Sequence, residues 1–328
     1  MTTANILSQL GSAGVSTGFK NRIINPGMVI DQRNAGASVT PTDGQYDVDR
    51  FCGRLTQASK FTLQQNAGSV TPPTGFTKYL GATSSSAYSV VSTDFFAIEQ
   101  WIEGYNCADL AWGTANAKTV TLSFQVYSSL TGTFGGSVRT YAGGYSYPFS
   151  YSIPVANTWT QISVTIAGPT AGTWNTTNSG SIGVAFSLGA GSTYSGTAGA
   201  WAAVNYLSAT GATSVVGTNG ATFYITGCQL EVGTTATNFE VRDYGRELIL
   251  CQRYYQYGRG DARGGLNTNN QVGYQYQFVV PMRAIPTITI TTISGTPNQA
   301  FQRADSFLWY GTTGTVENAG TWTATAEL

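Results

Sequence analysis

The sequence contains no histidine. Histidine is the commonest general base near neutral pH and the commonest side-chain ligand of transition metals. Its absence excludes catalytic triads built on imidazole and every zinc site that uses an imidazole ligand. We therefore expect a protein that is not an enzyme and that has no catalytic residues.

Charged side chains are also scarce. Sixteen basic and sixteen acidic residues make up 10% of the 328 residues and cancel to a net charge of zero, whereas an ordinary soluble domain has about 25% charged residues. No basic run is present, so we expect no nucleic-acid partner. Two compatible interpretations remain: a strand-rich chain whose surface is hydroxyls and amides, and a chain packed against copies of itself, because subunit contacts disfavour unpaired charges.

Long apolar runs and paired cysteines are missing as well. No apolar stretch reaches the ~18 residues of a membrane-spanning helix, so we expect no membrane insertion. Residues 1–10 lack the charged start and apolar core of a signal peptide, which predicts synthesis in a cytoplasm. The cysteines lie far apart without a Cys-x-x-Cys pair, which predicts buried free thiols rather than a metal cluster. They are Cys52, Cys107, Cys228 and Cys251.

Strand patterns fill most of the chain. The clearest is at residues 120–127, where every second side chain is apolar and the apolar ones share one face. Further strand patterns lie at residues 23–30, 46–54, 61–65, 97–103, 159–166, 182–188 and 222–232, and a looser one lies at residues 88–91. Short strands joined by Gly, Ser, Thr and Asn loops, without long helical periodicity, predict an all-β fold built as an antiparallel β-sandwich.

The chain divides into four predicted parts. These are an N-terminal arm at residues 1–20, a β-sandwich at 21–256, a linker at 257–270 and a smaller C-terminal β-domain at 271–328. The arm has too little apolar surface to fold alone, so it is either an attachment segment or a frayed terminus. The linker is predicted from four glycines, Gly258, Gly260, Gly264 and Gly265.

A short connecting helix is predicted before the linker. Leu248, Cys251 and Tyr255 lie at helical spacing within residues 243–255. The chain after the linker returns to strand patterns, which lie at residues 274–280, 287–293, 307–310 and 321–326. We therefore expect the helix to lie across the end of the sandwich and to join it to the second domain.

Three stretches of the sequence together resemble a recurring group of phage tail-fibre and virion proteins. The first is NRIINPGM at residues 21–28, followed by Gln32-Arg33, Tyr46 and DRF at 49–51. The second comprises NTW at 157–159, IAG at 166–168, GTW at 172–174 and GST at 191–193. The third, which is the most specific, comprises ITGCQLEVG at 225–233, ATNFEVR at 236–242, REL at 246–248 and CQRYY at 251–255. VPMRAIPT at 280–287 and AEL at 326–328 also resemble that group.

The resemblance implies a central domain similar to the jelly-roll sandwiches of carbohydrate-binding modules. It also implies location in a virion after synthesis in a host cytoplasm, a homotrimer, contacts with other virion proteins and contact with host surface glycans. The leading interpretation is thus a bacteriophage tail fibre or surface appendage that recognises a host glycan. The alternative is a capsid decoration or cement protein that bridges coat subunits through residues 1–20. A polysaccharide depolymerase is a distant third, because acidic residues do not cluster along repeated β-helical coils.

Within the third stretch, ordinary structural roles account for the residues. Residues 229–232 alternate polar and apolar, as in a closing strand of the sandwich. Phe239 is then expected to cap the core. Arg242 is expected to pair with a carboxylate such as Glu231 or Glu240.

Aromatic side chains supply the candidate ligand-binding residues. Aromatic residues make up 12% of the chain, and aromatic faces stack on the C–H surfaces of sugars. Four lie in Gly-, Ser- and Asn-rich surroundings, where a loop, such as one at residues 141–151, or a sheet face could expose them: Trp112, Tyr145, Trp174 and Trp201. The competing interpretation is that they fill the core, as we expect of Trp101, Trp159 and Phe124.

Carboxylates provide a candidate metal site and a candidate catalytic pair. Asp47 and Asp49 could hold a structural calcium ion together with backbone carbonyls, although Arg50 could pair with either carboxylate. We expect no other cofactor. Glu99 and Glu103 share a strand face at about 13 Å, which exceeds the ~5–9.5 Å of a glycosidase pair, so we expect them to be solvated.

One short motif invites a functional interpretation without supporting it. Arg259-Gly260-Asp261 matches an integrin-type tripeptide. Because it lies in the predicted glycine-rich linker, we interpret it as a chance occurrence.

Overall fold

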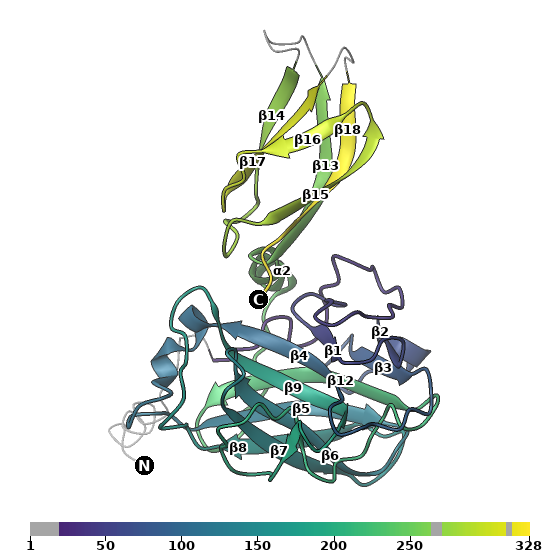
Figure 1. Cartoon of the computed structure of the whole chain (residues 1–328), viewed down its shortest axis with the longest axis vertical. Coiled ribbons are helices and arrows are strands. Elements are labelled where there is room, and N and C mark those ends of the chain that lie inside the picture. The colour runs from purple at the N-terminus through teal and green to yellow at the C-terminus, as the bar shows by residue number, and fades with distance from the viewer. Residues whose placement is uncertain (1–19, 264–270, 313–316) are drawn as a thin grey trace, which may run out of the picture.

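The computed structural model describes residues 20–263, 271–312 and 317–328, which form two β-domains joined by a helix (Figure 1). The larger domain contains two five-stranded antiparallel sheets. The first sheet has the order β1 (Cys52–Leu55), β4 (Phe95–Glu103), β9 (Gly180–Ala190), β6 (Gly132–Thr140) and β7 (Ser146–Ile153). The second sheet has the order β2 (Phe61–Gln65), β3 (Leu80–Ser84), β12 (Thr222–Val232), β5 (Val120–Ser128) and β8 (Thr160–Ile166).

The core lies between the two sheets and explains their strands. On β5 the alternate residues Val120, Leu122, Phe124 and Val126 are fully buried and face the first sheet. The other strands of both sheets alternate in the same way, so one continuous apolar cluster fills the sandwich. The predicted fold class, an all-β jelly-roll sandwich, is confirmed.

Short elements cover the sandwich and connect its strands. The 3-10 turns are η1 (Ala67–Ser69), η2 (Gly104–Asn106) and η3 (Ala108–Leu110). A two-residue parallel pair, β10 (Ser195–Gly196) and β11 (Ser208–Ala209), belongs to a long loop that lies over the outer face of the first sheet. Leu207 of this loop packs on Ala97 and Ala185 of that face.

Three of the predicted strands are wrong in whole or in part. The apolar run at 23–30 is buried but forms turns, because Asn25 and Met28 adopt left-handed φ angles and the Asn25 side chain bonds Ile30 at both backbone groups. Residues 88–91 form no strand, and of residues 46–54 only those from Cys52 onward do. Residues 141–151 are not one loop, since β7 begins at Ser146.

The connecting helix and the free thiols are present as predicted, although the helix ends at Gln252, and Tyr255, which the helical spacing included, begins strand β13 (Tyr255–Arg263). Helix α2 (Tyr244–Gln252) begins at Asp243, whose side chain accepts from the backbone N–H of Arg246, as an N-terminal cap does. Figure 1 shows α2 between the two domains. All four cysteines are buried and free. Among the described residues, no helix combines the length and the apolar character that crossing a membrane requires.

The C-terminal domain is a smaller sandwich of two three-stranded sheets. One sheet has the order β13 (Tyr255–Arg263), β18 (Glu317–Thr325) and β15 (Thr287–Ser294), and the other has the order β14 (Gln271–Gln277), β17 (Ser306–Thr312) and β16 (Pro297–Ala300). Its core is built around Phe307, Trp309 and Trp322.

The predicted linker at 257–270 is wrong in its first half. Residues 257–263 belong to strand β13, which pairs with β18 along its length, and residues 264–270 lie outside the described residues. The glycines were misleading because a Cβ at Gly258 would lie 2.7 Å from the Trp322 ring, and one at Gly260 would lie 2.5 Å from the Trp309 ring. They are packing positions for indole rings, and the tripeptide 259–261 is part of a strand.

A buried ionic network fixes the second domain to the first. The guanidinium of Arg50, which is 1% exposed, pairs with Glu327 and lies 3.5 Å from the centre of the Tyr254 ring. Arg33 bonds both Glu327 (2.7 Å) and Asp49 (2.9 Å). Because buried charges need partners, this network holds the two domains in a defined orientation.

Candidate functional site

The outward-facing side chains of the second sheet form rows across three of its strands. The register aligns the rows Tyr224-Tyr127, Thr226-Gln125-Gln161, Gln229-Ser123-Ser163 and Glu231-Thr121-Thr165. Strand β8 is the edge of this sheet, and its Gln161 and Ser163 are exposed. The face therefore presents amide and hydroxyl groups to solvent on its β8 side.

A hollow of about 380 Å³ lies over the two middle rows, and we call it the polar groove. Its lining residues are Phe76, Ser123, Gln125, Gln161, Ser163, Gly227, Ala236, Thr237, Asn238 and Phe239. None of them is charged. The Phe76 and Phe239 rings form one wall and meet edge to face, with centroids 4.9 Å apart.

The segment after β12 closes one end of the polar groove. Thr237 donates from its backbone N–H and its hydroxyl to the buried Glu231 carboxylate, at 2.8 and 2.6 Å. The backbone N–H of Glu240 donates to Gln229 Oε1 at 2.8 Å. These bonds hold Phe239 over the outer face of the sheet. The prediction that Phe239 caps the core is therefore wrong.

Gly227 makes room for the wall of the groove. It lies in a bulge of β12, between Thr226 and Gln229, with a φ of 62°. A Cβ at this position would lie 2.5 Å from the Phe76 ring. The bulge also turns Cys228 into the core, where it is fully buried. The most specific part of the resemblance, ITGCQLEVG, is thus the segment that shapes the groove.

Four aromatic rings border the other end of the groove. Tyr127 and Tyr224 stack with centroids 5.3 Å apart and an interplanar angle of 5°. Tyr79 stacks on Tyr224, and Trp159 lies against Tyr79 and Tyr127. Trp159 is half-buried on the outer face, so the prediction that it belongs to the core is wrong.

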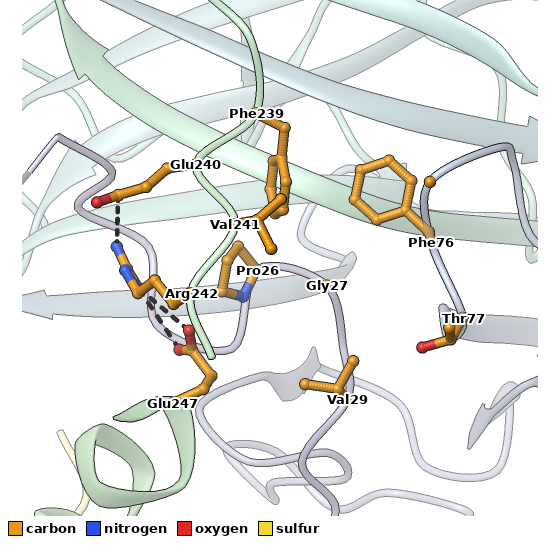
Figure 2. Close-up of a pocket in the computed structure, with 11 residues that line it drawn as sticks. Pro26, Gly27, Val29, Phe76, Thr77, Phe239, Glu240, Val241, Arg242 and Glu247 are labelled. Atoms are coloured by element: carbon orange, nitrogen blue, oxygen red, sulfur yellow. Dashed lines mark hydrogen bonds and ion pairs between the residues drawn. The ribbon is translucent and has the colours of Figure 1, made fainter. Parts of the chain in front are cut away.

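A second, smaller hollow adjoins the polar groove (Figure 2). It measures about 170 Å³ and shares Phe76 and Phe239 with the groove. Figure 2 shows its charged residues on one side, where Arg242 bonds Glu240 (3.1 Å) and Glu247 (3.4 Å). Of the partners predicted for Arg242, Glu240 is therefore confirmed. We call this second hollow the junction hollow.

The four aromatic residues proposed from sequence come together in one cluster at the end of the sandwich. Trp112 contacts Trp174 and Trp201 edge to face, at 4.8 and 5.6 Å between centroids. Tyr145 stacks on Trp201 at 5.5 Å with an interplanar angle of 7°. Loops far apart in sequence thus meet there.

The rings of this cluster are largely buried, and their indole N–H groups already have partners, as at the edge of a hydrophobic core. Trp112 is 7% exposed, and the other three are half-buried. Each indole N–H already donates to a backbone carbonyl: Trp112 to Lys118, Trp174 to Ala171 and Trp201 to Ala167, at 2.8, 3.1 and 2.7 Å. Contact of these rings with a ligand stays a prediction.

The two predicted calcium ligands, Asp47 and Asp49, have different surroundings. Asp49 is fully buried and accepts from Arg33, and burial raises the pKa of its carboxyl to about 6. Burial and the nearby Asp31 carboxylate raise the pKa of Asp47 to about 7. Within the described part of the chain, no three His, Cys, Asp or Glu side chains gather as a metal site requires. Calcium binding at Asp47 and Asp49 stays a prediction.

The candidate catalytic carboxylates are not solvated, so that prediction is wrong. Glu99 is fully buried and accepts two hydrogen bonds from Arg139, at 2.7 and 2.8 Å. Glu103 is 1% exposed and accepts from Arg253 and from the Tyr254 hydroxyl. Both residues lie on the outer face of the first sheet, where other parts of the chain cover them.

No protein-family model matches the sequence, and no curated protein matches it. Similar solved structures include the enzymatically active domain of tailspike protein 4 from bacteriophage CBA120, at 13% identity and a TM-score of 0.35, over 65% of this chain and 21% of that one. They also include a CBM4 module, at 14% identity and a TM-score of 0.31, over 64% of this chain and 98% of that one. A third is a family 11 carbohydrate-binding module from Clostridium thermocellum, at 12% identity and a TM-score of 0.30, over 62% of this chain and 100% of that one. Likenesses at these values do not bear on function. This chain spans 21% of the length of the tailspike domain.

Sequence reasoning missed the polar groove. Gln125, Gln161 and Ser163 are the polar half of ordinary strand alternation, so their residue types carry no special signal. One usable signal was present: two strands that pair both carry Ser and Gln two residues apart on their polar side. These residues are Ser123 and Gln125 on β5, and Gln161 and Ser163 on β8.

Proposed function

We propose that this chain is a non-enzymatic glycan-binding protein and that the polar groove is its binding site. The observation that carries the proposal is a neutral floor of amides and hydroxyls beside aromatic rings. Gln125 Nε2 donates to Gln161 Oε1, so both side chains are held over the floor. Amides and hydroxyls both donate and accept, as sugar hydroxyls require, and aromatic faces pack on sugar C–H groups.

We further propose that the protein belongs to a phage virion, as a tail fibre or surface appendage that forms a homotrimer. The support is the resemblance of residues 21–28 and 225–255 to phage virion proteins, together with the low charge of the chain. The buried ion pairs between the two domains suit an appendage that must present a binding face. Labelling virions with an antibody against this chain tests the role, because label over the whole capsid shell contradicts it.

The binding proposal is tested with a glycan array, followed by calorimetry on the glycans that bind. Ser163 is exposed on the edge strand β8, so Ser163→Tyr fills the groove without disturbing the core. We expect it to weaken binding at least about tenfold, which is a loss of about 1.4 kcal/mol.

The matched control is Ser152→Tyr. Ser152 is an exposed serine on β7, the edge strand of the first sheet, and lies away from the groove. This variant should bind glycans as the unmodified chain does. Equal loss in both variants, or no binding to any glycan on a broad array, would overturn the proposal.

A further inference from the structure

A third hollow, of about 360 Å³, lies where helix α2 and strand β13 meet the sandwich, and we call it the tyrosine hollow. Tyr244, Leu248 and Gln252 line it from α2, where their spacing of four residues places them on one face of the helix. Tyr257 of β13 and residues 30–32 of the sandwich complete the lining. These parts of the chain meet because α2 lies between the two domains (Figure 1). The volume falls within the roughly 300–1,000 Å³ of small-molecule sites.

The two tyrosine rings of this hollow are open to solvent. Tyr244 is 63% exposed and Tyr257 is 61% exposed. Tyr255, on the same face of β13 as Tyr257, already has the Arg33 guanidinium 3.8 Å from its ring centre. Among the residues that the structure describes, no cation lies over Tyr244 or Tyr257. Both rings are therefore available to a cation from outside the chain, which aromatic faces attract.

Asp31 gives the tyrosine hollow its charge, since the other described residues of the lining are neutral. The two oxygens of its carboxylate accept hydrogen bonds from the backbone N–H groups of Asn34 and Gly36, at 2.9 and 2.6 Å. These bonds hold the carboxylate in place. Its negative charge acts on the surroundings: burial raises the pKa of Asp47, and the Asp31 carboxylate raises it further, to about 7.

The neighbouring ion pairs do not balance the charge of Asp31. Arg33 pairs with Asp49 and Glu327, and Arg50 pairs with Glu327, so two guanidinium groups face two carboxylates. Within the part of the chain that the structure describes, Asp31 itself has no ion-pair partner. The tyrosine hollow is thus negative, and it favours a ligand that carries a positive charge.

Two side-chain amides can bind the rest of such a ligand. Gln32 donates from Nε2 to Asp49 and to the Tyr255 carbonyl, which leaves its Oε1 as an acceptor. The side-chain amide of Gln252 makes no hydrogen bond to any described residue. Amides both donate and accept, as sugar hydroxyls do. A sugar that bears an amine therefore matches the hollow better than a simple ammonium ion.

We propose that the tyrosine hollow binds an amino sugar through its protonated amine. Asp31 and the two tyrosine rings are the partners of the ammonium group, and Gln32 and Gln252 are the partners of the hydroxyls. Both kinds of contact are those that an organic cation makes in proteins. The hollow is separate from the polar groove, so it adds a second glycan site of a different preference to the chain.

The test compares glucosamine and glucose oligomers of the same length and linkage, titrated by calorimetry at a mildly acidic pH that keeps the amine protonated. The full chain carrying Ser163→Tyr, which fills the polar groove, isolates the tyrosine hollow. We expect this chain to bind the glucosamine oligomer about tenfold more tightly than the glucose oligomer, as a carboxylate and aromatic faces give to a cation.

Two further substitutions in the Ser163→Tyr chain test the assigned residues. Asp31→Asn and Tyr257→Thr should each weaken binding of the glucosamine oligomer about tenfold. Tyr257→Thr keeps the test valid if Asp31→Asn disturbs the turn at Asn34 and Gly36. The matched control is Tyr274→Thr, at a tyrosine that is 57% exposed on β14, in the other sheet of the same domain. It should leave the affinity unchanged, and urea unfolding checks that each variant is folded.

Three results would overturn this site. They are equal affinity for the two oligomers, a preference that survives Tyr257→Thr, and a loss of equal size in Tyr274→Thr. A lysine oligomer that binds as tightly as the glucosamine oligomer would also overturn the amino sugar and indicate a basic peptide. Neutral glycans that bind the Ser163→Tyr chain as they bind the unmodified chain would contradict the polar groove alone.

Discussion

The two outer faces of the sandwich differ in how they use polar side chains. The first sheet carries buried, paired charges: Glu99 is fully buried between Arg139 and Arg54, and Arg139 lies 4.4 Å from the centre of the Trp101 ring. On the second sheet the two rows that line the polar groove are neutral, and their Gln161 and Ser163 are exposed, whereas Glu231 in the next row is buried.

This difference suggests separate roles for the two faces: the charged face holds parts of the fold together, and the neutral face is available to a ligand. Buried charges are costly to strip of a partner, so those of the first sheet fasten the covering loop and the second domain to the sandwich. Exposed neutral amides cost little to leave in water, and they can exchange water for a ligand. A polar face that covers itself stabilises the fold, whereas a polar face left open is the one to examine for binding.

Breaking the charged face should give the largest loss of stability. Glu99→Ala leaves Arg139 buried without its carboxylate, so we expect the free energy of unfolding to fall by about 3–5 kcal/mol. Urea unfolding followed by fluorescence measures this change. Lys118→Ala removes an exposed ion pair with Asp109 and should change stability by less than about 1 kcal/mol. Comparable losses in the two variants would contradict the cohesive role of the first face.

The pH dependence of stability should reveal the cost of burying a charge at Asp47, in the turn before β1. Its pKa is about 7 in the folded protein, against about 3.9 when unfolded. The folded state therefore binds more protons between these values, and stability should fall as pH rises from about 4 to about 7. Asp47→Asn should flatten this part of the profile. The curves are measured with a calcium chelator present, and parallel curves for the two proteins would count against the assignment.

Changing Gly227 tests how the second face is shaped. Gly227→Ala places a side chain in a left-handed conformation, which costs about 1–2 kcal/mol, and presses its Cβ against Phe76. We expect both a lower unfolding free energy and weaker glycan binding. Gly199→Ala has a similar φ of 86° but no atom within 4 Å of the added Cβ. It should share the backbone cost and leave binding intact; a binding loss in this control would point away from Phe76.

The smallest effect on stability should come from the neutral face. Gln161→Ala removes an exposed amide, and surface changes of this kind usually stay within about 0.5 kcal/mol. Glycan binding should nevertheless weaken measurably in calorimetry. A large stability loss with unchanged affinity would show that the second face serves the fold as the first one does.

The sequence predicted the bounds of several strands well. Strand β2 and strand β12 have the predicted bounds, and β5 differs by one residue. The sequence did not predict strands in which glycine and serine dominate, such as β6. At Gly136 of β6 a side chain is excluded, because the Phe149 ring of the neighbouring strand occupies its place. Glycine in such a strand has a reason that lies elsewhere in the chain.

The aromatic residues show the same division. Phe124 is in the core as predicted. Trp101 is buried, as a core residue would be, but on the outer face of the first sheet, where Gly183 leaves room for its ring. Alternation shows that two residues share a strand face. It does not show whether another segment will cover that face.

The sequence by itself determined the all-β class, the closing strand, the connecting helix, the free thiols and the absence of imidazole chemistry, because these follow from residue type and local periodicity. Only the tertiary structure decided which polar face is buried and which is open, since that depends on a loop and on a second domain distant in the chain. It also decided that Trp112, Tyr145, Trp174 and Trp201 meet in one cluster. The groove exists because two strands and a distant phenylalanine pair converge, and such convergence leaves no local pattern.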